Sequence, residues 1–167
     1  VPPRRGTITV HADGASKPLT DARIAYRSGI VYLPQDRKTE GIFPALSILD
    51  NFRMLTVGEG SRFGFISRKR ALTAFEGHRA RLDIVLSKPS APITSLSGGN
   101  QQKVLLARLL EANPRAMLLN DPTRGVDYPT RLALFAAFEE LAGRTGLAIV
   151  VLSTEIDEIV THSHRAI

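Results

Sequence analysis

Short apolar runs and longer stretches with helical spacing alternate along this chain. Three runs have the length and the Val, Ile and Leu content of core strands, and they lie at 29–33 (GIVYL), 116–119 (AMLL) and 147–152 (LAIVVL). Residues 129–143 have a proline in the first turn and a helical pattern between the second and third runs. Strands that alternate with helices favour a parallel sheet, in which ligands bind at the carboxyl ends of the strands. The sequence therefore predicts an α/β fold.

A short β segment is predicted before the first of these strands. The sequence TITVH at 7–11 alternates like an edge strand and is followed by a turn signal at 13–14. Residues 17–27 are ambiguous and are compatible with a short helix. The chain starts with Val-Pro-Pro and without an initiator Met, so we expect the natural polypeptide to extend further upstream.

The pattern becomes helical at residue 47 and stays so up to residue 113. Ser47 and Asp50 have the spacing of a capping box at a helix start. A longer helix with one charged and one apolar face is predicted at 67–86, after a loop at 58–64. The next helix has an apolar stripe at Val104, Leu105, Leu109 and Ala112.

The 167 residues fit one domain or a piece of a larger one. We expect three parts, which are a β-rich start of the core at 1–46, a helical subdomain at 47–113 and the rest of the core at 114–167. The segment Ser153-Thr154-Glu155 follows the last predicted strand and is expected to cap a final helix.

Two polar stretches stand at positions where a ligand could bind. The first is SLSGGNQQK at 95–103, in which a hydroxyl, two glycines and an amide precede a helix. Free amides at a helix start form an anion site, and the helix dipole favours phosphate there. The alternative is a Ser-Gly-Gly turn that only begins a core helix. The second stretch is MLLNDPTRGVD at 117–127, a short apolar strand that ends in Asn120 and Asp121.

Together the two stretches resemble the signature and the Walker B plus D-loop of an ABC-transporter ATPase. LSGGNQQK with DPTRGVD is most similar to the second ATPase half of bacterial monosaccharide importers of the ribose, xylose and galactose type. The resemblance covers nearly the whole chain. It implies a P-loop NTPase (RecA-like) parallel-sheet core with an inserted helical subdomain. No G-x-x-x-x-G-K-[ST] occurs in the sequence, so we expect the chain to be truncated before the Walker A loop.

The resemblance assigns four residues to this chain's own nucleotide site. Gln35 matches the glutamine of the Q-loop, which approaches the metal and the attacking water; the alternative is a solvent-exposed loop amide. Asn120 matches the metal-associated position and Asp121 the catalytic Glu position. A neutral amide at 120 should weaken Mg²⁺ retention, and the shorter carboxylate at 121 should slow hydrolysis. Thr154 stands where most ABC ATPases have the switch histidine, and it is also a good helix N-cap.

A second set of residues is implied to serve the site of a partner. In a head-to-tail ABC dimer, each signature closes over the nucleotide held by the opposite half. Ser97, Gly98, Gly99 and Asn100 would bind the γ-phosphate, and Asp127 of the D-loop would lie across the dimer interface. The resulting hypothesis is an asymmetric ATPase, in which this domain completes a competent site and has a weak site of its own.

Charge and composition add little to this picture. The net charge is +6, with the surplus between Arg53 and Arg81, which is compatible with an anionic partner or with a solvated helix surface. Aromatic residues are not interleaved with these basic residues in a stacking pattern, so we expect no nucleic-acid partner. The chain has no cysteine. His162 and His164 are expected to be surface histidines.

The sequence therefore predicts the ATP-binding and hydrolysing part of an ABC sugar importer, with ATP and Mg²⁺ as cofactors. Its expected partners are a second ATPase half, a membrane permease contacted by the helical subdomain, and indirectly a periplasmic sugar-binding protein. It would act peripherally at the cytoplasmic side of the membrane. The alternatives are a pseudo-ATPase that binds without turnover and a non-transport ABC ATPase that acts on nucleic acid. We expect the 167 residues alone to be inactive.

Overall fold

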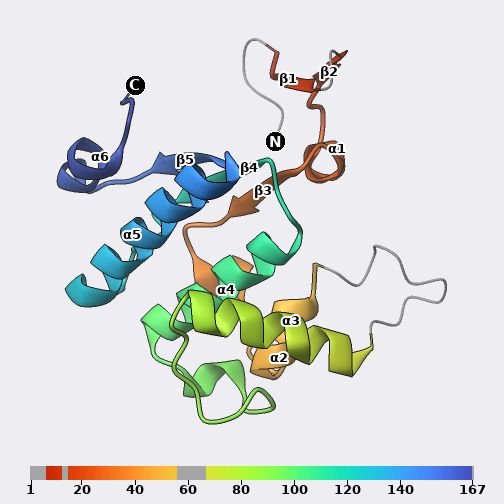
Figure 1. The fold of residues 1–167 in the computed structure, drawn as a ribbon, viewed down its shortest axis with the longest axis vertical. Coiled ribbons are helices and arrows are strands. Elements are labelled where there is room, and N and C mark those ends of the chain that lie inside the picture. Colours follow the sequence, from red (N-terminus) through yellow and green to blue (C-terminus); the bar gives the residue numbers. More distant parts are fainter. Residues whose placement is uncertain (1–6, 13–14, 56–66, 167) are drawn as a thin grey trace.

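The computed structural model describes residues 7–12, 15–55 and 67–166. Figure 1 shows a sheet with α5 (Tyr128–Thr145) and α6 (Ile156–His162) beside it, and a group of helices packed together at the other side of the molecule. The predicted turn at 13–14 and the predicted loop at 58–64 lie outside the described residues.

A three-stranded parallel sheet lies at the centre of the fold. Its strands are β3 (Ile30–Leu33), β4 (Ala116–Asn120) and β5 (Ala148–Leu152), in the order β3-β4-β5. The register pairs Leu33 with Leu119 and Leu119 with Val151. The three strands predicted from the apolar runs are therefore confirmed, and all of them are parallel.

The sheet is covered on one face and open on the other. Val31, Leu33, Met117 and Leu119 point into the core and are almost fully buried. The residues between them point the other way, and Tyr32, Leu118, Val150 and Leu152 are 39% to 65% exposed. Parallel strands normally have both faces covered. The prediction of core strands is therefore correct for one face of the sheet only. Successive side chains of a strand point to opposite faces, so only every second residue is buried.

The chain before this sheet forms a hairpin and a short helix. Strands β1 (Thr9–Ala12) and β2 (Ala15–Pro18) pair antiparallel in a sheet of their own. Helix α1 (Ala22–Arg27) follows, and the Asp21 side chain caps it by accepting from the Ile24 amide at 2.9 Å. The strand predicted at 7–11 is thus confirmed with a shifted range. The ambiguous segment contains the end of β2 as well as α1.

Helices α2 (Ile48–Arg53), α3 (Arg68–Arg81) and α4 (Gly98–Glu111) form the helical group. The capping box at α2 is confirmed, because the Asp50 amide donates to Ser47 Oγ at 3.1 Å. The rings of Phe52 and Phe75 join α2 and α3 edge to face at 5.2 Å. Helix α3 is shorter than predicted and ends at Arg81, two residues before Asp83, which has a φ of 49°. This left-handed residue turns the chain out of the helix.

Helix α4 is buried almost all round, although the sequence predicts an apolar stripe. It contacts α2 and α3 on one side and β3 and α5 on the other. Its buried polar side chains bond to carbonyl groups: Lys103 Nζ to Asp83 O at 2.8 Å and Arg108 Nη2 to Gly41 O at 2.8 Å. Burial lowers the pKa of Arg108 from its usual value. The polar residues of α4 therefore hold it among its neighbours.

Two further helices follow β4 and β5. Helix α5 (Tyr128–Thr145) has Pro129 in its first turn, as predicted, and ends at Gly146 with a φ of 69°. Helix α6 (Ile156–His162) begins after Glu155 without a side-chain cap. The prediction that Thr154 caps this helix is wrong, because Ser153 Oγ accepts from the Glu155 amide instead, at 3.1 Å. Among the described residues, no helix is both long and apolar enough to cross a membrane.

Candidate functional site

Three residues predicted for the nucleotide site meet at the carboxyl end of the sheet. Asp121 follows β4, and its Oδ2 accepts from Gln35 Nε2 at 2.5 Å. Its Oδ1 accepts from the backbone N–H of Thr154, which follows β5, at 2.8 Å. Gln35 itself follows β3. The structure thus brings together side chains and backbone from the ends of all three strands, as parallel pairing requires.

Asp121 is held in an unusual backbone conformation. Its φ is 44°, which is uncommon for a residue with a side chain, and it is only 6% exposed. Its amide donates to Leu152 O at 2.7 Å, so β5 fixes the backbone as well as the carboxylate. Strained residues that persist in this way concentrate at functional sites.

Both oxygens of the Asp121 carboxylate are already engaged. Each oxygen has a second lone pair, so Oδ2 can accept from a water molecule while it still accepts from Gln35. When Gln35 donates through Nε2, its carbonyl oxygen has no partner among the described residues. A neutral oxygen of this kind can serve as a ligand for a hard cation.

Asn120 points to the open face of the sheet. Its Nδ2 donates to the Tyr32 hydroxyl at 3.3 Å, across the β3–β4 pair. No cluster of three or more His, Cys, Asp or Glu able to hold a metal occurs within the described parts of the chain. The Asp121 carboxylate and the Gln35 amide fit Mg²⁺ when phosphate oxygens supply its other ligands, which is how proteins usually hold Mg²⁺. Asn120 bonds to Tyr32 instead, and no hydrogen bond joins it to this pair in the described part of the chain.

The predicted phosphate-binding loop begins helix α4. Ser97 is the N-cap residue, and its Oγ accepts from Asn100 Nδ2 at 3.1 Å. Asn100 Oδ1 accepts from the Val85 amide at 2.8 Å, so this side chain also fixes the loop before the signature. Ser97 is exposed and Gly98 half-buried. Ser97 at the start of the helix is therefore accessible to a partner.

Close packing favours glycine at 98 and 99 independently of any ligand, because a side chain at either position would displace Arg37 or Thr130. A Cβ at Gly98 would lie 2.5 Å from Arg37 Nη2 and 3.0 Å from Gly125 O. A Cβ at Gly99 would lie 2.9 Å from Thr130 Cγ2. The start of α4 therefore touches the turn after β4 and the start of α5, and the two glycines allow this approach.

Asp127 is the N-cap of α5. Its Oδ1 accepts from the Thr130 amide at 3.1 Å and from Thr130 Oγ1 at 2.9 Å. The backbone bond from Thr130, followed by the side-chain bond, lowers the pKa of Asp127 from its usual value. The sequence places Asp127 at a dimer interface, and the structure gives it a local role that is compatible with that position.

The sequence does not predict the role of Arg37. Its Nη1 donates to Arg124 O at 2.5 Å and its Nη2 to Gly125 O at 3.3 Å. The only sequence signal is the triplet Asp36-Arg37-Lys38 directly after Gln35. Arg37 therefore joins the segment after β3 to the turn after β4.

Glu158 is a second residue that the sequence does not single out. It is 6% exposed and accepts from Thr123 Oγ1 and from Ser153 Oγ, both at 2.7 Å. Arg131 Nη1 lies 3.3 Å from Glu158 Oε1. This carboxylate on α6 thus ties the turn after β4 to the segment after β5. The position of Glu158 in the sequence does not predict these contacts, because its partners lie outside α6.

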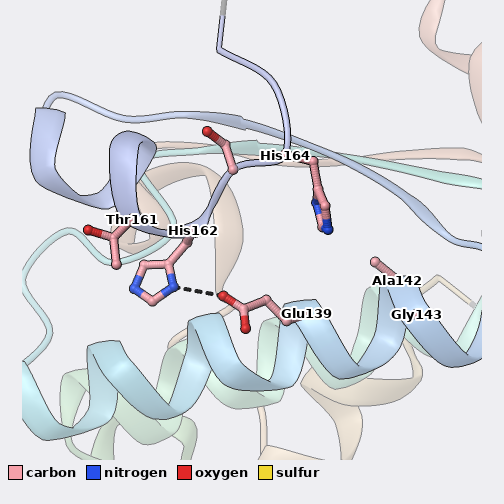
Figure 2. Close-up of a pocket in the computed structure, with 7 residues that line it drawn as sticks. Glu139, Ala142, Gly143, Thr161, His162 and His164 are labelled. Atoms are coloured by element: carbon pink, nitrogen blue, oxygen red, sulfur yellow. Dashed lines mark hydrogen bonds and ion pairs between the residues drawn. The ribbon is translucent and has the colours of Figure 1, made fainter.

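His162 is half-buried, with its side chain 20% exposed, whereas the sequence predicts a surface histidine. Its ring stacks on Phe135 at 4.5 Å, and its Nδ1 lies 2.8 Å from Glu139 Oε1. Figure 2 shows this pair beside a cavity of about 450 Å³ between α5 and the end of α6, with His164 on its other side. His164 is exposed, as predicted. The residues around this cavity include none of those predicted for nucleotide binding.

Comparisons with known proteins agree with this fold. Residues 1–124 match the ABC transporter family. The chain is 37% identical over 168 residues to ribose import ATP-binding protein RbsA 1 of Burkholderia ambifaria, covering 99% of this chain and 32% of that protein. It is 39% identical over 155 residues to RbsA 2 of Agrobacterium fabrum, covering 92% of this chain and 30% of that protein. The chain thus spans about a third of the length of these relatives.

Solved ABC cassettes have the same fold. A dimeric post-hydrolysis cassette bound to ADP and Pi superposes with a TM-score of 0.69 and 25% identity, covering 94% of this chain and 66% of that one. A dimeric bacterial ABC transporter cassette gives a TM-score of 0.72, with the same identity and coverage. The chain belongs to the ABC transporter family as an ATP-binding domain. The resemblance to ribose-type importers and the P-loop NTPase fold class are confirmed.

Proposed function

We propose that this chain is part of an ATP-binding and hydrolysing subunit of an ABC importer for a monosaccharide. The observation that carries the proposal is the meeting of Gln35, Asp121 and Thr154 at the ends of three parallel strands. Relatives that the chain matches over nearly its whole length are named ribose import ATP-binding proteins. The sugar that this importer would transport is therefore proposed to be a monosaccharide.

In the chain's own nucleotide site, Asp121 orients water and Gln35 approaches the metal. Mg²⁺ would neutralise charge on the phosphates. Asp121 is held by Thr154 and by Gln35, so its carboxylate is oriented before a nucleotide binds. The neutral side chain of Asn120 leaves the site with one carboxylate, which supports weak retention of the metal. We infer a site with low turnover.

The residues Ser97 to Asn100 serve the nucleotide that a partner ATPase half holds. Ser97 is exposed at the N-terminus of a helix of 14 residues, where amides and helix dipole favour phosphate. Asp127 is exposed beside this loop and lies toward the same partner. Two cassettes that this chain resembles are dimers, which is consistent with a partner half.

The other partners follow from the proposed import function. A membrane permease would contact the helical subdomain, and a periplasmic sugar-binding protein would deliver the sugar to that permease. The protein would sit peripherally at the cytoplasmic side of the membrane. Ser67 and the first turn of α3 are exposed. This turn contains basic residues and no acidic residue, so this end of the subdomain is positively charged.

A pseudo-ATPase is the second candidate. The neutral Asn120 at the metal-associated position favours it. In that case Ser97 would still contact the nucleotide that a partner ATPase half holds. The two candidates therefore differ in turnover at this chain's own site only.

The test is the sugar-stimulated ATPase activity of the full-length protein with its permease. Ser97→Arg should abolish most of the activity, because the longer cation blocks the phosphate of the partner site. Thr94→Arg is the control, because Thr94 is an exposed residue three positions before Ser97 and outside the helix start. Equal activity of the two variants would reject the proposed function.

A further inference from the structure

The guanidinium of Arg37 lies where three segments of the site meet. It follows Gln35 by two residues, and it donates to the carbonyls of Arg124 and Gly125 in the turn that begins at Asp121. It also lies against the first residue of α4, since a Cβ on Gly98 would come within 2.5 Å of Nη2. One side chain thus touches the segment after β3, the turn after β4 and the signature loop.

Arg37 is held tightly for a residue near the surface. Its Nε is buried and has no hydrogen-bond partner in the part of the chain that the structure describes. Burial lowers the pKa of Arg37, while the charge of Asp36 opposes this effect. A cation that is partly desolvated and incompletely bonded is costly for stability, so packing alone does not explain its presence.

The backbone behind Arg37 is also fixed to the signature helix. The short π-helical turn Arg37–Gly41 ends at Gly41, whose carbonyl accepts from Arg108 Nη2 at 2.8 Å. A Cβ on Gly41 would lie 2.9 Å from Leu105 Cδ1, so this turn packs directly on α4. A displacement of the segment after Gln35 is therefore passed to α4 through Arg108 and to the start of α4 through Arg37.

We propose that Arg37 is a positioning residue that couples this chain's own nucleotide site to the signature loop that serves its partner's site. A change at Gln35 or Asp121 moves the turn whose carbonyls Arg37 holds. The guanidinium, which lies against Gly98, then carries this movement to the start of α4. This inference rests on the proposed function, since it requires both sites to bind nucleotide.

The experiment is a double-mutant cycle in the ATPase activity of the full-length protein with its permease. Gln35→Ala alters the chain's own site, and Ser97→Ala alters the surface for the partner's site. In the otherwise unchanged protein, the combined effect on kcat/KM should differ from the product of the single effects by about five-fold or more. In the Arg37→Gln background, the combined effect on kcat/KM should agree with the product of the two single effects to within about two-fold.

Two further variants separate coupling from simple stability. Lys38→Gln is the matched control, because it removes a neighbouring exposed cation and should leave the five-fold coupling in place. Arg37→Lys keeps the charge and loses the planar fork that reaches two carbonyls. It should fold even where Arg37→Gln does not, and it should also lose the coupling.

The outcomes distinguish this inference from the proposed function. If neither Gln35→Ala nor Ser97→Ala changes the activity, the proposed function is wrong. If both change it and the coupling in the Arg37 variants equals that in the unchanged protein, only the role of Arg37 is wrong. If the effects of Gln35→Ala and Ser97→Ala are not coupled in the otherwise unchanged protein, the proposed role of Arg37 is also wrong.

Discussion

Gln35 and Asp121 are 86 positions apart in the sequence, and their side chains are joined by a hydrogen bond of 2.5 Å. The first follows β3 and the second follows β4, so the parallel pairing of these strands brings them together. This contact is the centre of the candidate nucleotide site. It links the residue implied to approach the metal to the residue implied to orient water.

Asp121→Ala should reduce the ATPase activity of the full-length protein less than Ser97→Arg does. The first change affects a site that already has a neutral residue at 120, whereas the second blocks a site completed in a partner. The same Asp121→Ala change should lower the free energy of unfolding by about 0.5 to 1.5 kcal/mol, because the Thr154 amide loses its acceptor. Activity assays and urea unfolding measure the two effects. A larger activity loss for Asp121→Ala would contradict the asymmetric assignment.

Glu158→Gln should destabilise the domain by about 1 to 3 kcal/mol. The amide of glutamine can accept on one side only, so the bond from Thr123 or the one from Ser153 is lost, and Arg131 loses its counter-charge. Glu155→Gln on the exposed surface is the control and should stay within about 0.5 kcal/mol of the unchanged protein. Equal unfolding midpoints for both variants would show that the Glu158 contacts contribute nothing.

Asp127→Asn should flatten the acid branch of the stability curve. The pKa of Asp127 is lower in the folded chain than its usual value, because the Thr130 amide and hydroxyl bond to the carboxylate. Its contribution is therefore complete above the unfolded-state pKa of about 3.9 and is lost as the pH falls through the folded-state value. Asparagine keeps the cap and removes the titration. Urea unfolding between about pH 2 and pH 5 would measure the difference, and parallel curves would contradict it.

Leu118→Ser should have different effects in the isolated chain and in the full-length protein. Leu118 lies in the open apolar face of the sheet, between Tyr32 and Val150 in the register of the three strands. In the isolated chain, a residue that is already 39% exposed contributes little when it is made polar. We expect a loss of about 1.5 to 3 kcal/mol in the full-length protein, where a covered parallel sheet would bury the side chain. Equal losses would mean that this face stays open.

The strands and the site at their ends follow from local sequence. Apolar runs of four to six residues bounded by polar or glycine residues are sufficient to predict β3, β4 and β5. Parallel order then places Gln35, Asp121 and Thr154 at one edge, although their roles come from the family resemblance. These roles and the division into subdomains stay predictions.

The contacts of the buried arginines could not be predicted in the same way. Arg37 and Arg108 bond to backbone carbonyls, and every residue offers such a carbonyl, so the sequence does not indicate which one is used. The burial of α4 on nearly all sides could not be predicted from the sequence either. Lys103 and Arg108 indicate a solvated face by residue type alone, and only tertiary packing shows where their charged ends lie.

The place of β4 between β3 and β5 has a consequence for synthesis on the ribosome. β3 ends at Leu33, but its neighbour is complete only when Asn120 has been added, after the whole helical group. At about 5 to 20 residues per second, this edge of the nascent strand waits roughly 4 to 17 seconds for its partner. During this delay the strand that contains Val31 and Leu33 can pair with non-native segments. The speed of translation through the helical segment should therefore affect the yield of folded protein.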